Sequence, residues 1–183
     1  MEHLRPRVAL SVATLVLLLL AGVPAHGWSQ ERPTTVIVVR HAEKASVEGR
    51  DPPLSEAGEQ RARALIEAVG AAGVKAIYAT QFQRTQQTAR PLAEHLGVPL
   101  TVFAATADAR QHAATLAGEI LSKHAGEVVV VVGHSNTVPE IVQALGGTAV
   151  PEIPESEYHN LFVVVIPSSG PPSTIRARYG AQS

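Results

Sequence analysis

The sequence predicts an α/β fold, a three-layer αβα sandwich with a mainly parallel central sheet. Apolar runs rich in β-branched residues, such as TTVIVVR (34–40) and EVVVVVGH (127–134), are typical of strands buried on both faces. Segments with the apolar spacing of helices alternate with these runs. Because parallel strands need a long crossover connection, this alternation favours a parallel sheet covered by helices on both faces.

The elements can be assigned in chain order from the residues that punctuate them. Ser55 is suited to cap a first helix, which the Gly70 and Gly73 region should end, and Gly97 should end a second helix. We expect strands over 34–40, 75–80, 98–104, 127–134, 160–167 and 174–180, the last at an edge, with later helices over 84–97, 109–126 and 137–147.

Prolines occur in two of these helices. Pro91 in the second helix suggests a kink or a later start. In the last helix, Pro139 suits the first turn, and Thr137 with Glu140 fits a capping box. We therefore expect Thr137 to be the cap and Glu140 to be engaged in capping.

The N-terminus has a pattern of its own. Arg5 and Arg7 precede an apolar run over residues 8–23, and the polar stretch that follows begins with small residues. A basic start, an apolar centre and small residues before a polar segment are typical of a secretory signal peptide. An uncleaved anchor is the alternative, although the apolar run is slightly short for a full membrane span.

The signal peptide is expected over residues 1–27, with cleavage after Ala25 or Gly27. Residues 28–183 then form a single exported domain, periplasmic or secreted, without a stable membrane span once the signal is removed. The domain is of ordinary size and can bury a sizeable core.

Composition excludes several classes of function. The formal net charge of −1 gives no basic excess, so neither nucleic acid nor an anionic membrane surface is an expected partner. Cysteine is absent, which excludes disulfides, thiolate metal sites and a cysteine nucleophile. No metal and no other cofactor is expected, because the histidines lack the close spacing that is typical of zinc sites.

Polar residues follow two buried strands at their carboxyl ends. Arg40 and His41 end the first strand, and His134 follows the fourth. Ligands of open α/β sheets bind outside the carboxyl ends of the strands, so both histidines are expected in one crevice if these strands are neighbours. Neutral imidazole is a nucleophile toward phosphorus, and Arg40 with Arg84 would supply planar forks for phosphoryl oxygens.

Three segments carry a resemblance to a known family. RHAEK, QRTQQTA and GHSNT, in this order, resemble the signature segments of the histidine phosphatase superfamily, also called phosphoglycerate mutase-like. The resemblance covers essentially the whole mature chain. Ala42 stands where the family usually has glycine, a small-for-small change that should be tolerated.

The resemblance implies a role for each matching residue. His41 would attack phosphorus and become the phosphohistidine, while Arg40, Arg84 and His134 bind the phosphoryl oxygens, with His134 cationic. Water would then hydrolyse the phosphoenzyme without a metal ion. From the residues themselves, Ser135 and Asn136 at the entry to a helix are suited either to capping or to presenting backbone N–H donors to phosphate.

The general acid is assigned by position. One branch of the family has Asp after the second histidine, where this chain has Ser135, and the other has Glu some way after the second arginine. Asp108 lies in that window and is the preferred candidate, with a helix N-cap as its alternative role. Glu43, two residues after the nucleophile, is the second candidate.

Together these observations predict an exported phosphomonoesterase that acts through a phosphohistidine on His41. A short loop before Pro53 leaves the site open to water, which favours hydrolysis. Its partner would be a phosphorylated small molecule or a phosphate group of the cell envelope. The alternative is a non-catalytic protein that binds phosphoryl ligands or takes part in envelope interactions.

Overall fold

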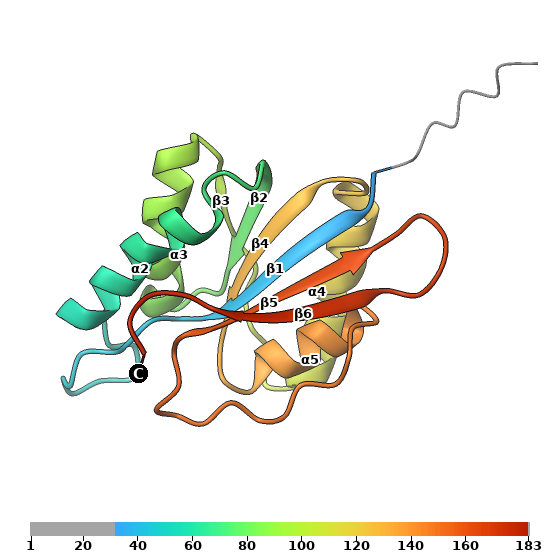
Figure 1. Ribbon diagram of the computed structural model, residues 1–183. Helices are drawn as coiled ribbons and strands as arrows, with labels where there is room; N and C mark the ends of the chain where they lie inside the picture. Colours follow the sequence, from blue (N-terminus) through green and yellow to red (C-terminus); the bar gives the residue numbers. More distant parts are fainter. Residues whose placement is uncertain (1–31, 183) are drawn as a thin grey trace, which may run out of the picture. The chain divides into compact units, whose positions relative to one another are not determined.

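The computed structural model describes residues 32–182, so the predicted signal peptide lies outside the described residues. The strands are β1 (Thr34–Arg40), β2 (Val74–Ala79), β3 (Leu100–Val102), β4 (Val128–Gly133), β5 (Asn160–Ile166) and β6 (Ser173–Arg178) (Figure 1). The helices are α2 (Glu56–Val69), α3 (Gln83–Leu96), α4 (Ala109–Lys123) and α5 (Thr137–Ala144).

The six strands form one mixed sheet in the order β3-β2-β4-β1-β5-β6. Strands β3, β2, β4 and β1 run parallel to one another, whereas β5 is antiparallel to both β1 and β6. The apolar runs of β1 and β4 are paired along their length, with Arg40 opposite Gly133. The two strands that carry the histidines are therefore neighbours at the centre of the sheet.

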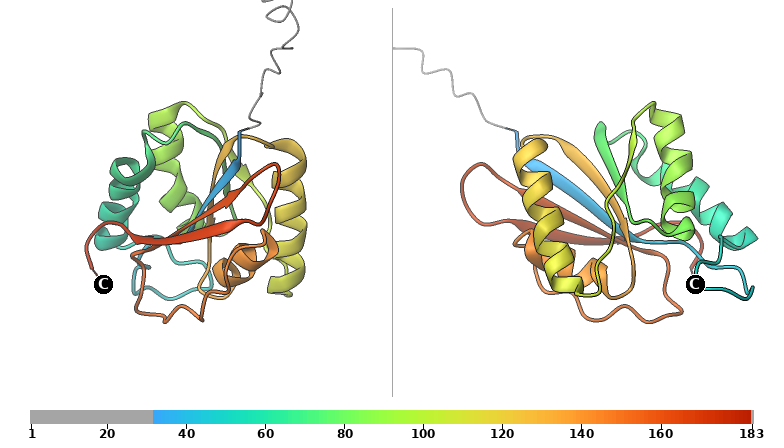
Figure 2. Two further views of the ribbon diagram at one scale, coloured as in Figure 1. Left: turned by 45° about the vertical axis from the view of Figure 1, so that its right-hand side comes forward. Right: turned by 180° about the vertical axis from the view of Figure 1, so that it is seen from behind.

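Helices cover both faces of the sheet, which confirms the predicted three-layer α/β fold. Figure 2 shows α2 and α3 on one side of the strands and α4 and α5 on the other. Alternate residues of β1 divide between the two cores: Val36 and Val38 pack in the core with α4 and α5, and Ile37 and Val39 in the core with α2 and α3. This division follows from the two-residue repeat of a strand that is buried on both faces.

Two helix boundaries agree with the capping and terminating residues expected from the sequence. Ser55 caps α2 by accepting a hydrogen bond from the Gly58 N–H, 3.2 Å away. Gly97 ends α3 in the left-handed conformation, at a φ of 65°, where glycine avoids the steric cost of a Cβ. Strand β6 lies at an edge of the sheet, as expected.

Other boundaries differ from the prediction. Helix α3 begins at Gln83 and continues through Pro91, so a later start is wrong. The capping box of α5 is also wrong, because the N-cap is Asn136, while the Thr137 hydroxyl accepts a hydrogen bond from the His134 N–H (2.9 Å). Glu140 instead lies 3.4 Å from an Arg110 nitrogen.

None of the helices found between residues 32 and 182 has the length and hydropathy to cross a membrane.

Candidate active site

The carboxyl ends of three neighbouring strands, β1, β4 and β2, lie side by side at one end of the sheet. His41 follows β1 and His134 follows β4, and their ring centroids are 5.4 Å apart. Strand β2 ends next to β4 at Ala79, and the first turn of α3 carries Arg84 to the same edge. The expected crevice therefore forms, because the strands that carry the two histidines are paired in parallel.

A cavity of about 260 Å³ opens at this edge. It is lined by His41, Lys44, Phe82, Arg84, Ala105, Thr106, His134, Ser135, Asn136, Thr137 and Glu155. The structure thus brings together five of the predicted site residues, and Arg40 lies buried directly before His41 with 1% of its side chain exposed. Asp108 does not line this cavity.

His41 is held in a single tautomer. Its Nδ1 lies 2.7 Å from the carbonyl oxygen of Ala42, and since a carbonyl can only accept, Nδ1 carries the proton. The lone pair is then on Nε2, the nitrogen that could attack an electrophile. The imidazole is buried, with 3% of the residue exposed, and its orientation is fixed by the Ala42 backbone.

His134 is oriented through a chain of hydroxyl groups. Arg84 Nη2 lies 3.5 Å from His134 Nδ1, and an arginine can only donate, so Nδ1 is the accepting nitrogen. The opposite nitrogen, Nε2, donates to the Thr80 hydroxyl (2.9 Å), which lies 2.9 Å from the Thr85 hydroxyl. Thr85 donates to the Phe82 carbonyl at 2.8 Å and so ends the chain on the backbone.

Burial keeps both imidazoles neutral. It lowers the pKa of His41 to about 3, and the charges of Arg40 and Arg84 act in the same direction. The pKa of His134 is lowered to about 4 by burial and then by Arg84. Before an anion binds, His134 is therefore neutral, and the cationic form implied by the resemblance would require a phosphoryl group to offset its charge.

The guanidinium of Arg40 is fixed by the loop before β5. Nη1 donates to the carbonyl oxygens of Pro154 (2.8 Å) and Glu157 (3.1 Å), and Nη2 donates to Glu155 Oε2 (2.8 Å). The ring of Tyr158 lies under the guanidinium carbon at 4.2 Å. The Nε–H of Arg40 is buried and has no hydrogen-bond partner among the described residues.

Arg84 has a similar unpaired donor. Its Nη1 lies 3.5 Å from Asp51, and its guanidinium carbon lies 4.4 Å from the centroid of the Phe82 ring. Its Nε is also buried without a partner in the described part of the chain. Buried donors are normally paired, so these two arginine N–H groups are exceptions, and of the two arginines Arg84 lines the cavity, where its positive charge suits an anionic ligand.

The segment QRTQQTA anchors the residues around His41. The Thr88 hydroxyl accepts from the Ala42 N–H (2.9 Å), and Gln87 accepts from the Leu54 N–H (2.8 Å). Ala42 is fully buried beside Leu54, so the small side chain in place of the family's usual glycine is accommodated. This segment therefore supplies Arg84 and also ties α3 to the backbone that orients the nucleophile.

Ser135 and Asn136 both border the cavity, and neither side chain caps α5. The Ser135 hydroxyl donates instead to Glu155 Oε1 at 2.6 Å. Both residues lie at the amino end of α5, where backbone N–H groups are suited to an anion. Their assignment to phosphate binding stays a prediction.

The two candidate acids have other partners. Asp108 caps α4 by accepting from the Arg110 and Gln111 N–H groups at 2.9 and 3.0 Å, as its alternative role predicts. Glu43 forms a bidentate pair with Arg61. Burial acts to raise the pKa of Glu43, but the Arg61 guanidinium holds it below its usual range, so Glu43 is a carboxylate at neutral pH.

Four side chains at the site were not predicted from the sequence. They are Thr80, Phe82, Glu155 and Tyr158. Thr80 directly follows β2, so the rule that placed His41 and His134 at strand ends also indicates this position. Glu155 and Tyr158 lie in a loop without periodicity, and only the pairing of β5 with β1 brings this loop to Arg40.

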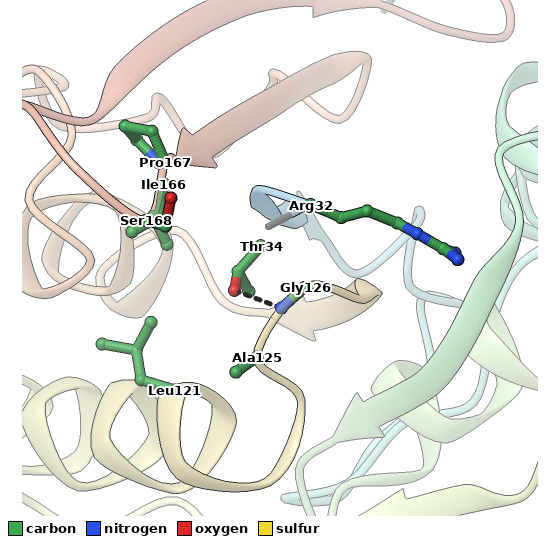
Figure 3. Close-up of a pocket in the computed structure, with 8 residues that line it drawn as sticks. All are labelled: Arg32, Thr34, Leu121, Ala125, Gly126, Ile166, Pro167 and Ser168. Atoms are coloured by element: carbon green, nitrogen blue, oxygen red, sulfur yellow. Dashed lines mark hydrogen bonds between the residues drawn. The ribbon is translucent and has the colours of Figure 1, made fainter. Parts of the chain in front are cut away.

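A larger cavity, of about 620 Å³, lies at the opposite end of the sheet, around Thr34 and Gly126 (Figure 3). Of the described residues that line it, only Arg32 is charged, and its side chain extends away from the others. Size therefore does not identify the site, whereas the converging histidines and arginines do. Within residues 32–182, no group of three or more metal-ligating side chains gathers at either place.

Comparison with known proteins agrees with this geometry. The family model of the histidine phosphatase superfamily (branch 1) matches residues 36–108, a stretch that includes Arg40, His41 and Arg84. No curated protein sequence matches the chain.

Several solved structures share the fold. The protein histidine phosphatase SixA in complex with tungstate has a TM-score of 0.63 and 19% identity, covering 79% of this chain and 96% of its own. Bacillus stearothermophilus YhfR has a TM-score of 0.62 and 20% identity, and the match covers 82% of this chain and 98% of YhfR. A mycobacterial glucosyl-3-phosphoglycerate phosphatase has a TM-score of 0.59 and 16% identity, covering 81% and 99%. At these identities the likeness establishes the fold.

Proposed function

We propose that the protein is an exported phosphomonoesterase that acts through a phosphohistidine on His41. The match of residues 36–108 to the histidine phosphatase superfamily supports an enzyme of the phosphatase class. One observation carries the proposal. His41 is a buried, neutral imidazole whose Nε2 holds the lone pair, and it borders a cavity beside two arginines with unpaired Nε–H donors. A nucleophile and two cations around one small cavity suit a phosphoryl group.

In the first step, His41 Nε2 attacks phosphorus and the bond from phosphorus to the ester oxygen breaks. The phosphoryl group passes to His41, while its oxygens are bound by Arg40, Arg84 and His134. The leaving oxygen takes a proton and departs as an alcohol. Because Nδ1 of His41 already donates to the Ala42 carbonyl, that bond supports the positive charge that forms on the phosphorylated ring.

In the second step, water attacks phosphorus and the bond between phosphorus and Nε2 breaks. The proton that water loses passes to the group that protonated the leaving oxygen in the first step, inorganic phosphate leaves, and His41 returns to its neutral form. The arginines supply the positive charge that many phosphatases draw from metal ions, so we propose that no metal is required.

Asp108 remains the proposed proton donor for the leaving oxygen, although its carboxylate caps α4. In support, Thr106 of the same loop borders the cavity. The variant Asp108→Asn keeps the cap, since asparagine caps helices as well as aspartate does, and removes the acid. If Asp108 donates the proton, kcat/KM falls far more for alkyl phosphates than for activated aryl phosphates. Equal losses for both substrate types would leave Asp108 as a cap alone.

The N-terminal sequence supports a proposal for the location, and the open site supports one for the substrate class. We propose export through the signal peptide at residues 1–27, with a scavenged small phosphate ester or an envelope phosphate group as substrate. Among the structural neighbours are a protein histidine phosphatase and a phosphatase of a sugar phosphoglycerate, so both phosphoprotein and small-molecule substrates occur on this fold.

The test of the proposal is hydrolysis of phenyl phosphate by the purified protein in excess EDTA, with His41→Ala as the matched variant. We expect activity that survives EDTA and is lost in His41→Ala. Activity lost to EDTA would instead indicate a metal-dependent hydrolase.

A non-catalytic phosphoryl binder is the second candidate. The observation in its favour is that Glu43 and Asp108, the two candidate acids, are both engaged in structural contacts. Phosphate binding by the wild type without hydrolysis of any ester would support it.

A further inference from the structure

Glu155 occupies the mouth of the candidate active site. Its Oε2 lies 2.8 Å from Arg40 Nη2 and 3.8 Å from Lys44 Nζ, and its Oε1 accepts the Ser135 hydroxyl at 2.6 Å. Of the described residues that line the cavity, it alone carries a carboxylate. The Ser135 hydroxyl, together with the charges of Arg40 and Lys44, holds the pKa of Glu155 below its usual range.

This carboxylate differs from a buried structural acid. Its side chain is 69% exposed, whereas the Arg40 side chain that it contacts is 1% exposed. Glu155 therefore faces the solvent from which a substrate arrives, and it rests on a fixed, buried cation. An approaching ligand meets the negative charge of Glu155 before it meets the charge of Arg40.

Glu155 uses only one of the Arg40 nitrogens. Nη2 is used by Glu155, while the buried Nε has no partner among the described residues. Glu155 thus leaves one donor of Arg40 unused, and Arg84, which lines the cavity, also has an unpaired Nε. For a phosphoryl group bound beside these arginines, the rest of the ligand would lie close to Glu155, the exposed carboxylate among the described residues that line the cavity.

Lys44 is partly engaged by this carboxylate. Its ammonium group is the remaining cation at the mouth, and it already pairs with Glu155 at 3.8 Å. A second anionic group on a substrate would be repelled by Glu155 and would find Lys44 engaged. A cationic group would be attracted to the exposed carboxylate.

We propose that Glu155 is a specificity-determining residue, which makes the site favour phosphoryl ligands whose remaining part is neutral or cationic over those that carry a second anion. This inference rests on the proposed function, because it assumes that the phosphoryl group binds at Arg40 and Arg84. It defines the substrate class as monoesters of neutral or amino-bearing alcohols. Bisphosphates and phosphorylated carboxylic acids are disfavoured by like-charge repulsion.

The test uses three non-hydrolysable ligands of similar length: propylphosphonate, 2-aminoethylphosphonate and 2-carboxyethylphosphonate. Their dissociation constants are measured by calorimetry on the full-length wild type, on Glu155→Gln and on Glu152→Gln. Glu152→Gln is the matched control, because it removes the same charge from an exposed position in the same loop. Glu155→Gln replaces an exposed side chain, and circular dichroism checks that the variant is folded.

The wild type should bind the amino ligand most tightly and the carboxyl ligand most weakly. In Glu155→Gln the ratio of these two dissociation constants should fall about fivefold or more, the size expected for a partly exposed charge interaction. Lys44→Gln in the Glu155→Gln background should remove the part of the gain in carboxyl binding that comes from the released ammonium group, and keep the part that comes from the loss of repulsion by Glu155. Glu152→Gln should keep the wild-type ratio.

An unchanged ratio in Glu155→Gln would overturn the inference, and so would the absence of propylphosphonate binding to every protein tested. These outcomes are distinct from failure of the proposed function, since binding needs no turnover. Selective binding without hydrolysis of phenyl phosphate would refute the phosphatase and retain the selectivity. Hydrolysis of phenyl phosphate together with an unchanged ratio of dissociation constants would support the phosphatase and refute the selectivity.

Discussion

His41 and Arg84 show how single residues acquire a chemical role from their neighbours. An exposed histidine is partly protonated near neutral pH, but burial lowers the pKa of His41 to about 3 and leaves Nε2 free to attack. Arg84 is held from two sides, by Asp51 at 3.5 Å and by the Phe82 ring. His41 and Arg84, the proposed nucleophile and phosphate-binding fork, are therefore arranged before a ligand arrives, which lowers the cost of organising the site.

Asp51 is a positioning residue for Arg84. Its carboxylate accepts from the Gln83 N–H at 2.9 Å, at the start of a helix whose N-cap, Phe82, provides no side-chain cap. In Asp51→Asn the ion pair with Arg84 is lost and the arginine fork is less well fixed. We expect the inhibition constant of orthovanadate to rise about three- to tenfold, with a smaller effect on kcat.

Glu48→Gln is the control for this variant, because Glu48 is an exposed carboxylate in the same loop. It should leave the inhibition constant unchanged. Equal inhibition constants in Asp51→Asn and the wild type would show that Arg84 is positioned without Asp51.

At the scale of elements, the start of α2 supports the loop that follows His41. The Ser55 N–H donates to the Glu43 carbonyl at 2.9 Å, and Arg61 of α2 binds the Glu43 carboxylate. Gly58 packs so closely that an added Cβ would lie 2.3 Å from the Glu43 carbonyl oxygen. The backbone two residues after His41 is thus fixed by contacts with α2.

Substitution of Gly58 tests this support. Gly58→Ala should lower the free energy of unfolding by about 1–3 kcal/mol, because the methyl group displaces the Glu43 backbone, and it should reduce phosphatase activity. Gly118→Ala in α4 is the matched control, since nothing lies within 4 Å of its added Cβ. That variant should gain about 0.5–1 kcal/mol from helix propensity. Urea unfolding of both variants measures the difference, and a stabilised Gly58→Ala would contradict the packing.

The strand ends were predictable and the loop contacts were not, for a physical reason. A buried strand has a local signature, so Arg40, His41 and His134 could be placed at one edge once parallel pairing was inferred. Glu155 reaches Arg40 only because β5 returns antiparallel beside β1, and no local pattern encodes that path. The predicted cap of α5 was wrong for a different reason. Thr137 has a suitable hydroxyl, but this hydroxyl accepts a hydrogen bond from the His134 N–H.

Strand length was also set by context. The apolar stretch 98–104 predicts a longer strand than the three residues of β3, which lies at an edge and pairs only with β2. A single neighbour gives fewer ladder hydrogen bonds, and sequence propensity alone does not reveal the position of a strand in the sheet.

At the scale of the whole molecule, the buried histidines link stability to pH. The pKa of His41 is about 3 and that of His134 about 4, against 6.5 for the free side chain. Below pH 6.5 the unfolded chain therefore binds more protons than the folded one, so stability falls as the pH falls. Between about pH 7 and about pH 5 each of these two imidazoles should lower the free energy of unfolding by about 1–2 kcal/mol.

Urea unfolding of the wild type and of His41→Asn at these two pH values measures the effect. The variant lacks one titrating group and should lose less stability than the wild type over the same interval. The Glu43 and Glu155 carboxylates titrate below their usual range, so they contribute little in this window. A wild type that is equally stable at both pH values would contradict the buried neutral histidines.

The most direct measurement is to trap the phosphoenzyme. The purified protein is mixed with phenyl phosphate in excess EDTA, quenched rapidly in alkali, where phosphohistidine survives, and mapped by mass spectrometry. We expect phosphate on His41 in the wild type and none in His41→Ala. Turnover with no phosphorylated peptide, or with phosphate on another residue, would contradict His41 as the nucleophile.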